Sequence, residues 1–232
     1  MSNITIMGIA GLPEIEPGDD LALMIVDAIT SNGLELLPND ILVVTHKVVS
    51  KQEGRVVEIP TEDAYRAVVA DESVSIIRRR GDLVIAQTRH GFICANAAVD
   101  RSNVAAGYAL LLPVDPDRSA HRLRTLIARA TGTDVGIVIT DTFGRPWRRG
   151  LVDVAIGVSG VTAIVDLKGT TDTHGNVLNV TEVNVVDEIA AAADLVMGKA
   201  TGIPVAIVRG LALSGEGRAT DIVRPAHEDL FR

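Results

Sequence analysis

Short apolar runs rich in β-branched residues constrain the fold of this chain most. The runs ILVVT (41–45), VGIVIT (135–140) and PVAIVR (204–209) are apolar at nearly every position. A strand with one wet face would alternate apolar and polar residues, so these runs predict strands of a sheet covered on both faces. Shorter or more mixed runs predict further strands at 55–59, 82–87, 152–158 and 162–167.

Helical periodicity alternates with these runs. Apolar residues share one face from Leu21 to Ile29 until Gly33, and a shorter pattern surrounds Tyr65 to Val69. Two further helices are predicted after Ser119, ending at Gly132, and after Asp187. The predicted class is therefore mixed α and β. With no linker or repeat, we expect one domain over residues 1–232, in which any division into two lobes depends on packing.

Composition excludes several kinds of protein. The chain has a net charge of -8 and 3% aromatic residues, which argues against a nucleic-acid-binding groove. No apolar run approaches the roughly 20 residues of a membrane helix, and no basic-then-apolar leader opens the chain. The only cysteine, Cys94, lies in an apolar stretch and is predicted to be a buried structural thiol. These features favour a cytoplasmic protein without nucleic-acid or membrane partners.

The segment ITDTFGRPWRRG (139–150) places Asp141 and Thr142 at the predicted end of a strand. Open sheets present ligand-binding groups there, and a carboxylate beside a hydroxyl suits Mg²⁺ or Mn²⁺. Arg145 and Arg148 follow in the next turn, and either guanidinium could bind a phosphate group bidentately. The alternative is that Asp141 caps a turn while Trp147 packs on arginine stems.

Two other segments carry similar chemistry. Residues 93–103 group Asn96, Asp100, Ser102 and Asn103 after a strand, either as metal ligands or as ordinary turn-formers. Residues 45–55, predicted to form a loop just beyond another strand, carry His46, Lys47 and Lys51, either on a solvated face or in contact with phosphate.

The remaining charged residues give weaker signals. Arg78, Arg79 and Arg80 are interpreted as a solvated face, with ligand binding as the alternative. The other histidines lack the spacing of a zinc site, and MGKAT (197–201) lacks the first glycine of a phosphate loop. The segment 171–176 is predicted to be an exposed hairpin tip.

Five blocks of sequence together resemble one family. They are GLPEI with PGDD (11–20), VVTHKVVSKQEGR (43–55), TRHGFICANAAVDRSNV (88–104), DTFGRPWRRGLVDVAIGVSG (141–160) and DEIAAAADLVMGKATGIPVAIVRGL (187–211). In this order they resemble the coenzyme F420:L-glutamate ligase family, CofE, whose module also forms the N-terminal half of the longer FbiB proteins.

The resemblance implies a GTP-dependent ligase that adds L-glutamate to coenzyme F420-0 and extends a γ-linked oligoglutamate tail through an acyl phosphate, releasing GDP and phosphate. It implies an unusual two-lobed α/β fold that forms an intertwined homodimer. It also implies two divalent cations per subunit, Mg²⁺ or Mn²⁺, with K⁺ as a further candidate cation.

The resemblance also assigns residues. Contacts to GTP are expected from Leu12, Pro13, Glu14, Ile15, Lys51, Asn103 and position 46, with Arg145 as a further candidate. Asp100 and Asp141 are expected to share one cation, and Thr142 to hold a second. The expected catalytic residues are Asp100, Asp141 and Lys51. Position 46 departs from the family pattern, since His46 stands where a serine is usual.

Three alternatives remain open at this point. A metal-dependent nucleotide phosphohydrolase would need the same acidic segments but no amino-acid acceptor. A nucleotide-binding regulatory module would bind GTP without chemistry. A glutamate ligase could also act on a different carboxylated acceptor.

Overall fold

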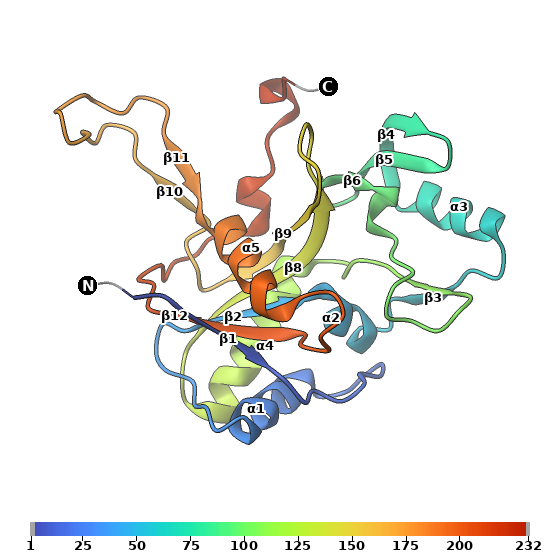
Figure 1. The fold of residues 1–232 in the computed structure, drawn as a ribbon, viewed down its shortest axis with the longest axis horizontal. Coiled ribbons are helices and arrows are strands. Elements are labelled where there is room, and N and C mark those ends of the chain that lie inside the picture. Colours follow the sequence, from blue (N-terminus) through green and yellow to red (C-terminus); the bar gives the residue numbers. More distant parts are fainter. Residues whose placement is uncertain (1–2, 231–232) are drawn as a thin grey trace.

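The computed structural model describes residues 3–230. A five-stranded sheet forms its centre (Figure 1). The strands in spatial order are β1 (Thr5–Ile9), β12 (Val205–Arg209), β2 (Ile41–Thr45), β8 (Gly136–Gly144) and β9 (Leu151–Ser159). β2 and β8 run parallel, and each other neighbouring pair runs antiparallel.

Helices cover both faces of this sheet. One apolar cluster joins Leu42 and Val44 to α1 (Leu21–Ser31) and α4 (Pro116–Thr131). A second cluster joins Ile41 and Val43, which point to the opposite face, to α5 (Val185–Met197). Each such side chain contributes about 1.5–3 kcal/mol when fully buried. The predicted sheet with two covered faces is therefore confirmed.

Side-chain caps determine where the helices begin. Asp20 accepts a hydrogen bond from Leu23 N–H at 3.1 Å, as expected for the first helix. Asp115 caps α4 through Arg118 N–H at 3.0 Å, so that helix begins at Pro116, before the predicted Ser119. Asn184 likewise accepts from Asp187 N–H at 3.2 Å and begins α5 earlier than predicted.

Smaller sheets flank the central one. β3 (Val56–Glu58) pairs with β7 (Tyr108–Leu110), and a three-stranded sheet holds β4 (Ser73–Arg80), β5 (Leu83–Thr88) and β6 (Ile93–Ala95). With α3 (Glu62–Asp71) they lie to the right of the central sheet in Figure 1. Arg78, Arg79 and Arg80 are all exposed on β4, in line with a solvated face.

An arm projects on the other side of the molecule. β10 (Ile164–Asp166) pairs with β11 (Glu182–Asn184), and the chain between them projects away from the central sheet (Figure 1), with residues 173–176 exposed. The predicted exposed tip at 171–176 is confirmed. The C-terminal part carries the short 3-10 helices η2 (Ala219–Ile222) and η3 (Ala226–Glu228).

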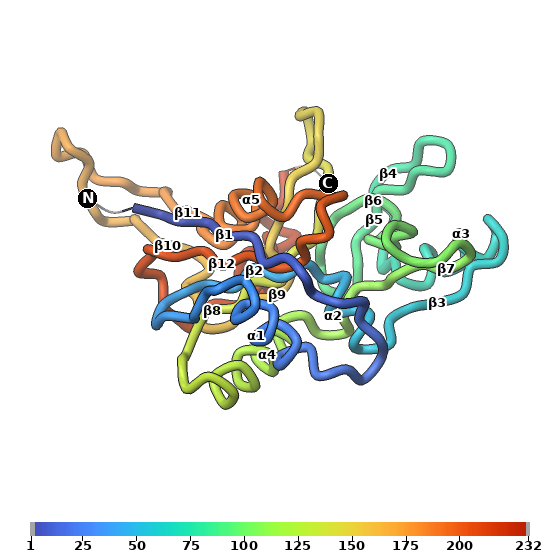
Figure 2. Tube along the Cα trace, turned by 60° about the horizontal axis from the view of Figure 1, so that its bottom comes forward, coloured from blue at the N-terminus to red at the C-terminus, as the bar shows by residue number. Residues whose placement is uncertain are grey.

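One prediction was wrong in a way that matters for function. Residues 46–52 were expected to leave β2 as a loop, but they form the helix α2 (His46–Gln52) directly after Thr45. β8 also continues through Asp141 and Thr142 to Gly144, and the hairpin that it forms with β9 rises between α5 and β6 (Figure 2). No helix within residues 3–230 is long and apolar enough to cross a membrane.

Candidate active site

A pocket of about 500 Å³ collects side chains from segments far apart in the sequence. Most of the residues that the sequence singles out for nucleotide or metal line this pocket: Leu12, Pro13, Glu14, Ile15, Lys51, Asp100, Asn103 and Thr142. A volume of this size lies within the range of small-molecule sites. The pocket is therefore the candidate active site.

Helix α2 supplies two lysines to the pocket. Lys47 and Lys51 are four residues apart, so a helix brings them to one face, and both line the pocket. Lys51 forms an ion pair with Glu14, whose side chain is 77% exposed while that of Lys51 is only 13% exposed. Lys47 forms an ion pair with Asp100. The pocket therefore contains two mostly buried ammonium groups that could bind an anionic ligand.

The loop that carries Asp100 is held by an unusual backbone. The preceding 3-10 turn η1 (Asn96–Ala98) has positive φ angles at all three residues, 49°, 51° and 59°. Asp100 then accepts hydrogen bonds from Ser102 N–H at 2.7 Å and Ser102 Oγ at 2.9 Å. Burial raises the pKa of Asp100, but Lys47 and Ser102 outweigh that effect and leave the pKa below its usual value.

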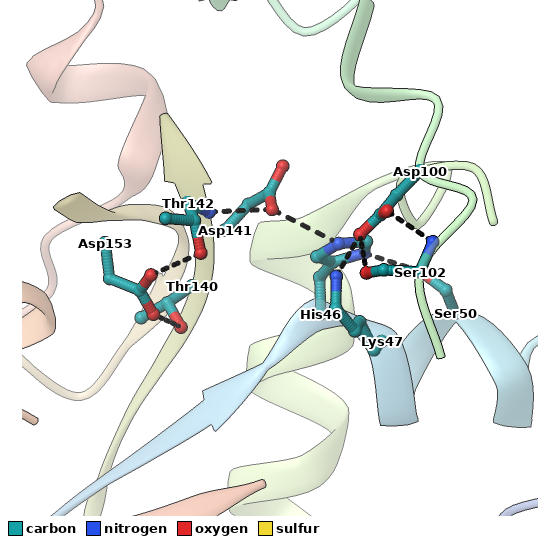
Figure 3. Close-up of polar contacts among 9 residues, drawn as sticks. All are labelled: His46, Lys47, Ser50, Asp100, Ser102, Thr140, Asp141, Thr142 and Asp153. Carbon is teal, nitrogen blue, oxygen red and sulfur yellow. Dashed lines mark hydrogen bonds and ion pairs between the residues drawn. The ribbon is translucent and has the colours of Figure 1, made fainter. Parts of the chain in front are cut away.

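Strand β8 separates two predicted ligands that are neighbours in sequence. Successive side chains of a strand point to opposite faces, and Thr142 lines the pocket. Asp141 contacts the first residue of α2 instead, with Oδ1 3.3 Å from His46 Nε2 and a side chain only 10% exposed (Figure 3). Thr142 N–H donates to the same Oδ1 at 2.7 Å.

The electrostatics of Asp141 favour its charged form. Burial raises the pKa of this carboxyl, but His46, Lys47 and the Thr142 N–H together hold the pKa below its usual value. Lys47 therefore acts on both Asp100 and Asp141. The two acids lie in one electrostatic neighbourhood although they come from different segments.

Three predicted residues, Asp141, His46 and Arg145, are not among the residues that line the pocket. His46 is fully buried and is not among the residues that line the pocket. Arg145 is exposed in the turn after β8 and does not line the pocket either. A nucleotide contact by His46 or Arg145 stays a prediction.

Asp153 and Asp194 were missed as residues of the pocket, and Lys199 was considered only within MGKAT (197–201), which was set aside as a phosphate loop. Asp153 on β9 accepts hydrogen bonds from Thr140 and Thr142, and Asp194 on α5 and Lys199 also line the pocket. Burial and then the charge of Asp153 raise the pKa of Asp194, with Lys199 opposing them. An aspartate inside the apolar run VDVAIGV was the one signal in the sequence.

The chemistry of the donor set fits a hard divalent cation. Carboxylates from Asp100 and Asp141 and the Thr142 hydroxyl are oxygen donors, as Mg²⁺ and Mn²⁺ prefer. Among residues 3–230, no group of three or more His, Cys, Asp or Glu side chains is arranged to hold a metal ion. Mg²⁺ is commonly bound by one or two carboxylates plus substrate phosphates, so a nucleotide would complete such a site.

Comparisons with known proteins agree on one family. A family model described as F420-0:Gamma-glutamyl ligase matches residues 10–210. The coenzyme F420:L-glutamate ligase of Methanothermobacter thermautotrophicus is 41% identical over 99% of this chain and 99% of its own length. The proteins of that name from Methanopyrus kandleri, covering 94% of each chain, and Archaeoglobus fulgidus, covering 99% and 96%, are also 41% identical. The chain therefore belongs to the F420-0:gamma-glutamyl ligase family.

Proposed function

We propose that this protein is a GTP-dependent ligase that joins L-glutamate to coenzyme F420-0 and then extends a γ-linked oligoglutamate tail. The names of its relatives support the substrates and the type of reaction. One observation in the structure supports the nucleotide: a single pocket unites the 12–15 loop, two lysines, Asp100, Asn103 and Thr142.

The lysines of α2 suit a triphosphate. Lys47 and Lys51 are each held in an ion pair with an acid of the pocket, which orders the ammonium groups before a ligand arrives. An incoming phosphate would exchange these partners for its own oxygens, as a charge-assisted contact. The loop 12–15 contributes apolar wall to the same pocket, which suits the base or sugar of a nucleotide.

The reaction must activate a carboxylate, because a carboxylate is a poor electrophile. The γ-phosphoryl group of GTP would move to a carboxylate oxygen of F420-0, releasing GDP and giving an acyl phosphate. The amine of glutamate would attack the acyl carbon, a proton would leave the nitrogen, and inorganic phosphate would depart. Holding the reactants in one pocket supplies much of the rate by positioning.

Asp100, Asp141 and Thr142 are the residues that we propose to hold divalent cations, with the two acids sharing one ion. When bound, such cations neutralise the charge on the transferring phosphoryl group. The lowered pKa values of Asp100 and Asp141 keep both carboxylates ionised and able to act as ligands at neutral pH. Lys51 would neutralise phosphate charge beside them.

The test is a mass-resolved assay of the purified chain with GTP, Mn²⁺, L-glutamate and F420-0. We expect a ladder of glutamate-sized mass increments with matching GDP, and loss of both in Asp141→Asn with the fold retained. GDP release that neither F420-0 nor glutamate changes would instead identify a phosphohydrolase. Increments on another carboxylated compound but not on F420-0 would identify a ligase with a different acceptor.

We also propose a homodimer, which is implied by the family resemblance. Light scattering coupled to size-exclusion chromatography measures the mass directly, against 24.5 kDa for one chain. A mass of about one chain at micromolar concentration would rule out a stable dimer.

A further inference from the structure

His46 lies beneath the candidate site. Its side chain has no exposed surface, and its imidazole lies between Ser50 on its own helix and Asp141 on β8 (Figure 3). Resting on the proposed function, we infer that His46 is a positioning residue that holds the Asp141 carboxylate in the orientation needed for a cation, and that it does not contact the nucleotide.

The two ring nitrogens have different surroundings. Nδ1 lies 3.2 Å from Ser50 Oγ, one helical turn away. Nε2 is buried and faces Asp141 Oδ1 at 3.3 Å, without the alignment of a full hydrogen bond and with no other hydrogen-bond partner among the described residues. The tautomer with hydrogen on Nε2 places a donor toward the carboxylate and lets Nδ1 accept from the serine.

These contacts distinguish the two oxygens of Asp141. Oδ1 faces His46 Nε2 and also accepts a hydrogen bond from Thr142 N–H. Oδ2 has no hydrogen-bond partner among residues 3–230, and Figure 3 shows it pointing away from the imidazole. His46 and Thr142 therefore restrain one oxygen and leave the other available to a ligand.

The length of the side chain is essential to this role. A serine at position 46 would end near its own backbone and could not reach across to β8, so Asp141 would lose this neighbour. Because Nε2 has no other partner, nothing else in the described structure accounts for a buried imidazole aimed at the carboxylate. Loss of a group that orients a metal ligand typically costs roughly 10–100-fold in metal affinity or activity.

The test separates cation binding from nucleotide binding. Mn²⁺ affinity is measured by electron paramagnetic resonance on the full chain at one saturating GTP concentration that is the same for every variant, and GTP affinity is measured by calorimetry with EDTA present. In His46→Ala we expect Mn²⁺ affinity to fall roughly 10–100-fold, while GTP affinity stays within about twofold. His46→Gln, which keeps an N–H near the position of Nε2, should recover most of the Mn²⁺ affinity. His121→Gln, exposed on α4, is the matched control and should change neither affinity.

Each outcome can be assigned. Unchanged Mn²⁺ affinity in a folded His46→Ala, with Asp141→Asn losing it, would overturn the role of His46 alone. A fall in GTP affinity in EDTA would show a nucleotide contact instead and would also overturn it. If Asp141→Asn keeps wild-type Mn²⁺ affinity, the proposed metal site itself fails. Should His46→Ala not fold, His46→Leu keeps much of the buried volume but has no N–H to face Asp141, and wild-type Mn²⁺ affinity in that variant would overturn the inference.

Discussion

Thr142 and Asp153 face each other across the β8–β9 hairpin, and the threonine hydroxyl donates a 2.6 Å hydrogen bond to Asp153 Oδ1. Thr140 donates to the other oxygen at 3.0 Å. Both oxygens of a buried carboxylate are thus used to fix the wall of the candidate active site. This arrangement ties the stability of the hairpin to the orientation of Thr142.

We therefore expect Asp153→Asn to destabilise the protein. The asparagine amide keeps one oxygen as an acceptor but turns its NH₂ group toward a threonine hydroxyl that donates in the wild type. Thr140 is fully buried, so no solvent can replace the acceptor that its hydroxyl would lose. A lost hydrogen bond to a buried charged group costs about 1.5–3 kcal/mol. Thermal unfolding should show a midpoint lower by roughly 2–4 °C per kcal/mol. Asp63→Asn, on a side chain that is 91% exposed, is the control, and equal midpoints in both variants would contradict the expectation.

Lys51→Ala should weaken nucleotide binding. The ammonium group lines the pocket and lies close to Glu14, so its removal takes a positive charge from the wall proposed to face phosphate. Contacts to charged groups are worth about 1.5–3 kcal/mol, which is about 10–150-fold in the dissociation constant for GTP. Calorimetry measures this constant, with Lys168→Ala on the exposed arm as the control. GTP affinity within twofold of wild type would remove Lys51 from the proposed contacts.

Cys94 should be inert in the folded protein. Burial, and then the charge of Asp141, raises the pKa of this thiol to about 12, so almost no thiolate forms at pH 8. A thiol reagent that absorbs on reaction should therefore react slowly in buffer and fast in denaturing urea. Fast reaction of the native chain would show that the wall between Cys94 and solvent opens readily.

Much of the central sheet could be predicted from the sequence. β2, β8 and β12 are buried on both faces, because α5 lies on one side of the sheet and α1 and α4 on the other. Burial on both faces requires consecutive apolar residues, and such runs are easy to recognise in the sequence. Helix α2 could not be predicted, because it has only seven residues and little apolar periodicity of its own. Its formation depends on contacts with β7 and β8, which lie far along the chain, so no local sequence pattern reveals it.

The candidate site was predictable segment by segment but not as an arrangement. Loops with lysines, acids and asparagine could be singled out, since their chemistry is local. The sequence did not show that Asp141 and Thr142 point to opposite faces of a strand. Their polar side chains suggested that the strand ended at Thr140, whereas β8 continues to pair with β9 up to Gly144. Asp194 was missed because it lies in a helix whose other residues are mostly apolar, where nothing marks it as facing a pocket.

Asp194 gives the last prediction, which concerns pH. Burial and then the neighbouring charge of Asp153 raise its pKa, so the folded state holds this proton more tightly than the unfolded state does. The charged form of Asp194 is therefore disfavoured in the folded state, so the free energy of unfolding falls as the pH rises from the ordinary carboxyl range through the folded pKa. Below the ordinary carboxyl range this destabilisation is absent. Asp194→Asn should therefore raise the unfolding midpoint at pH 7, with the difference from wild type vanishing as the pH falls below about 4. Glu188→Gln, exposed on the same helix, should bring no such gain at pH 7. A lower midpoint for Asp194→Asn at pH 7 would mean that Lys199 stabilises the charged form more than burial and Asp153 oppose it.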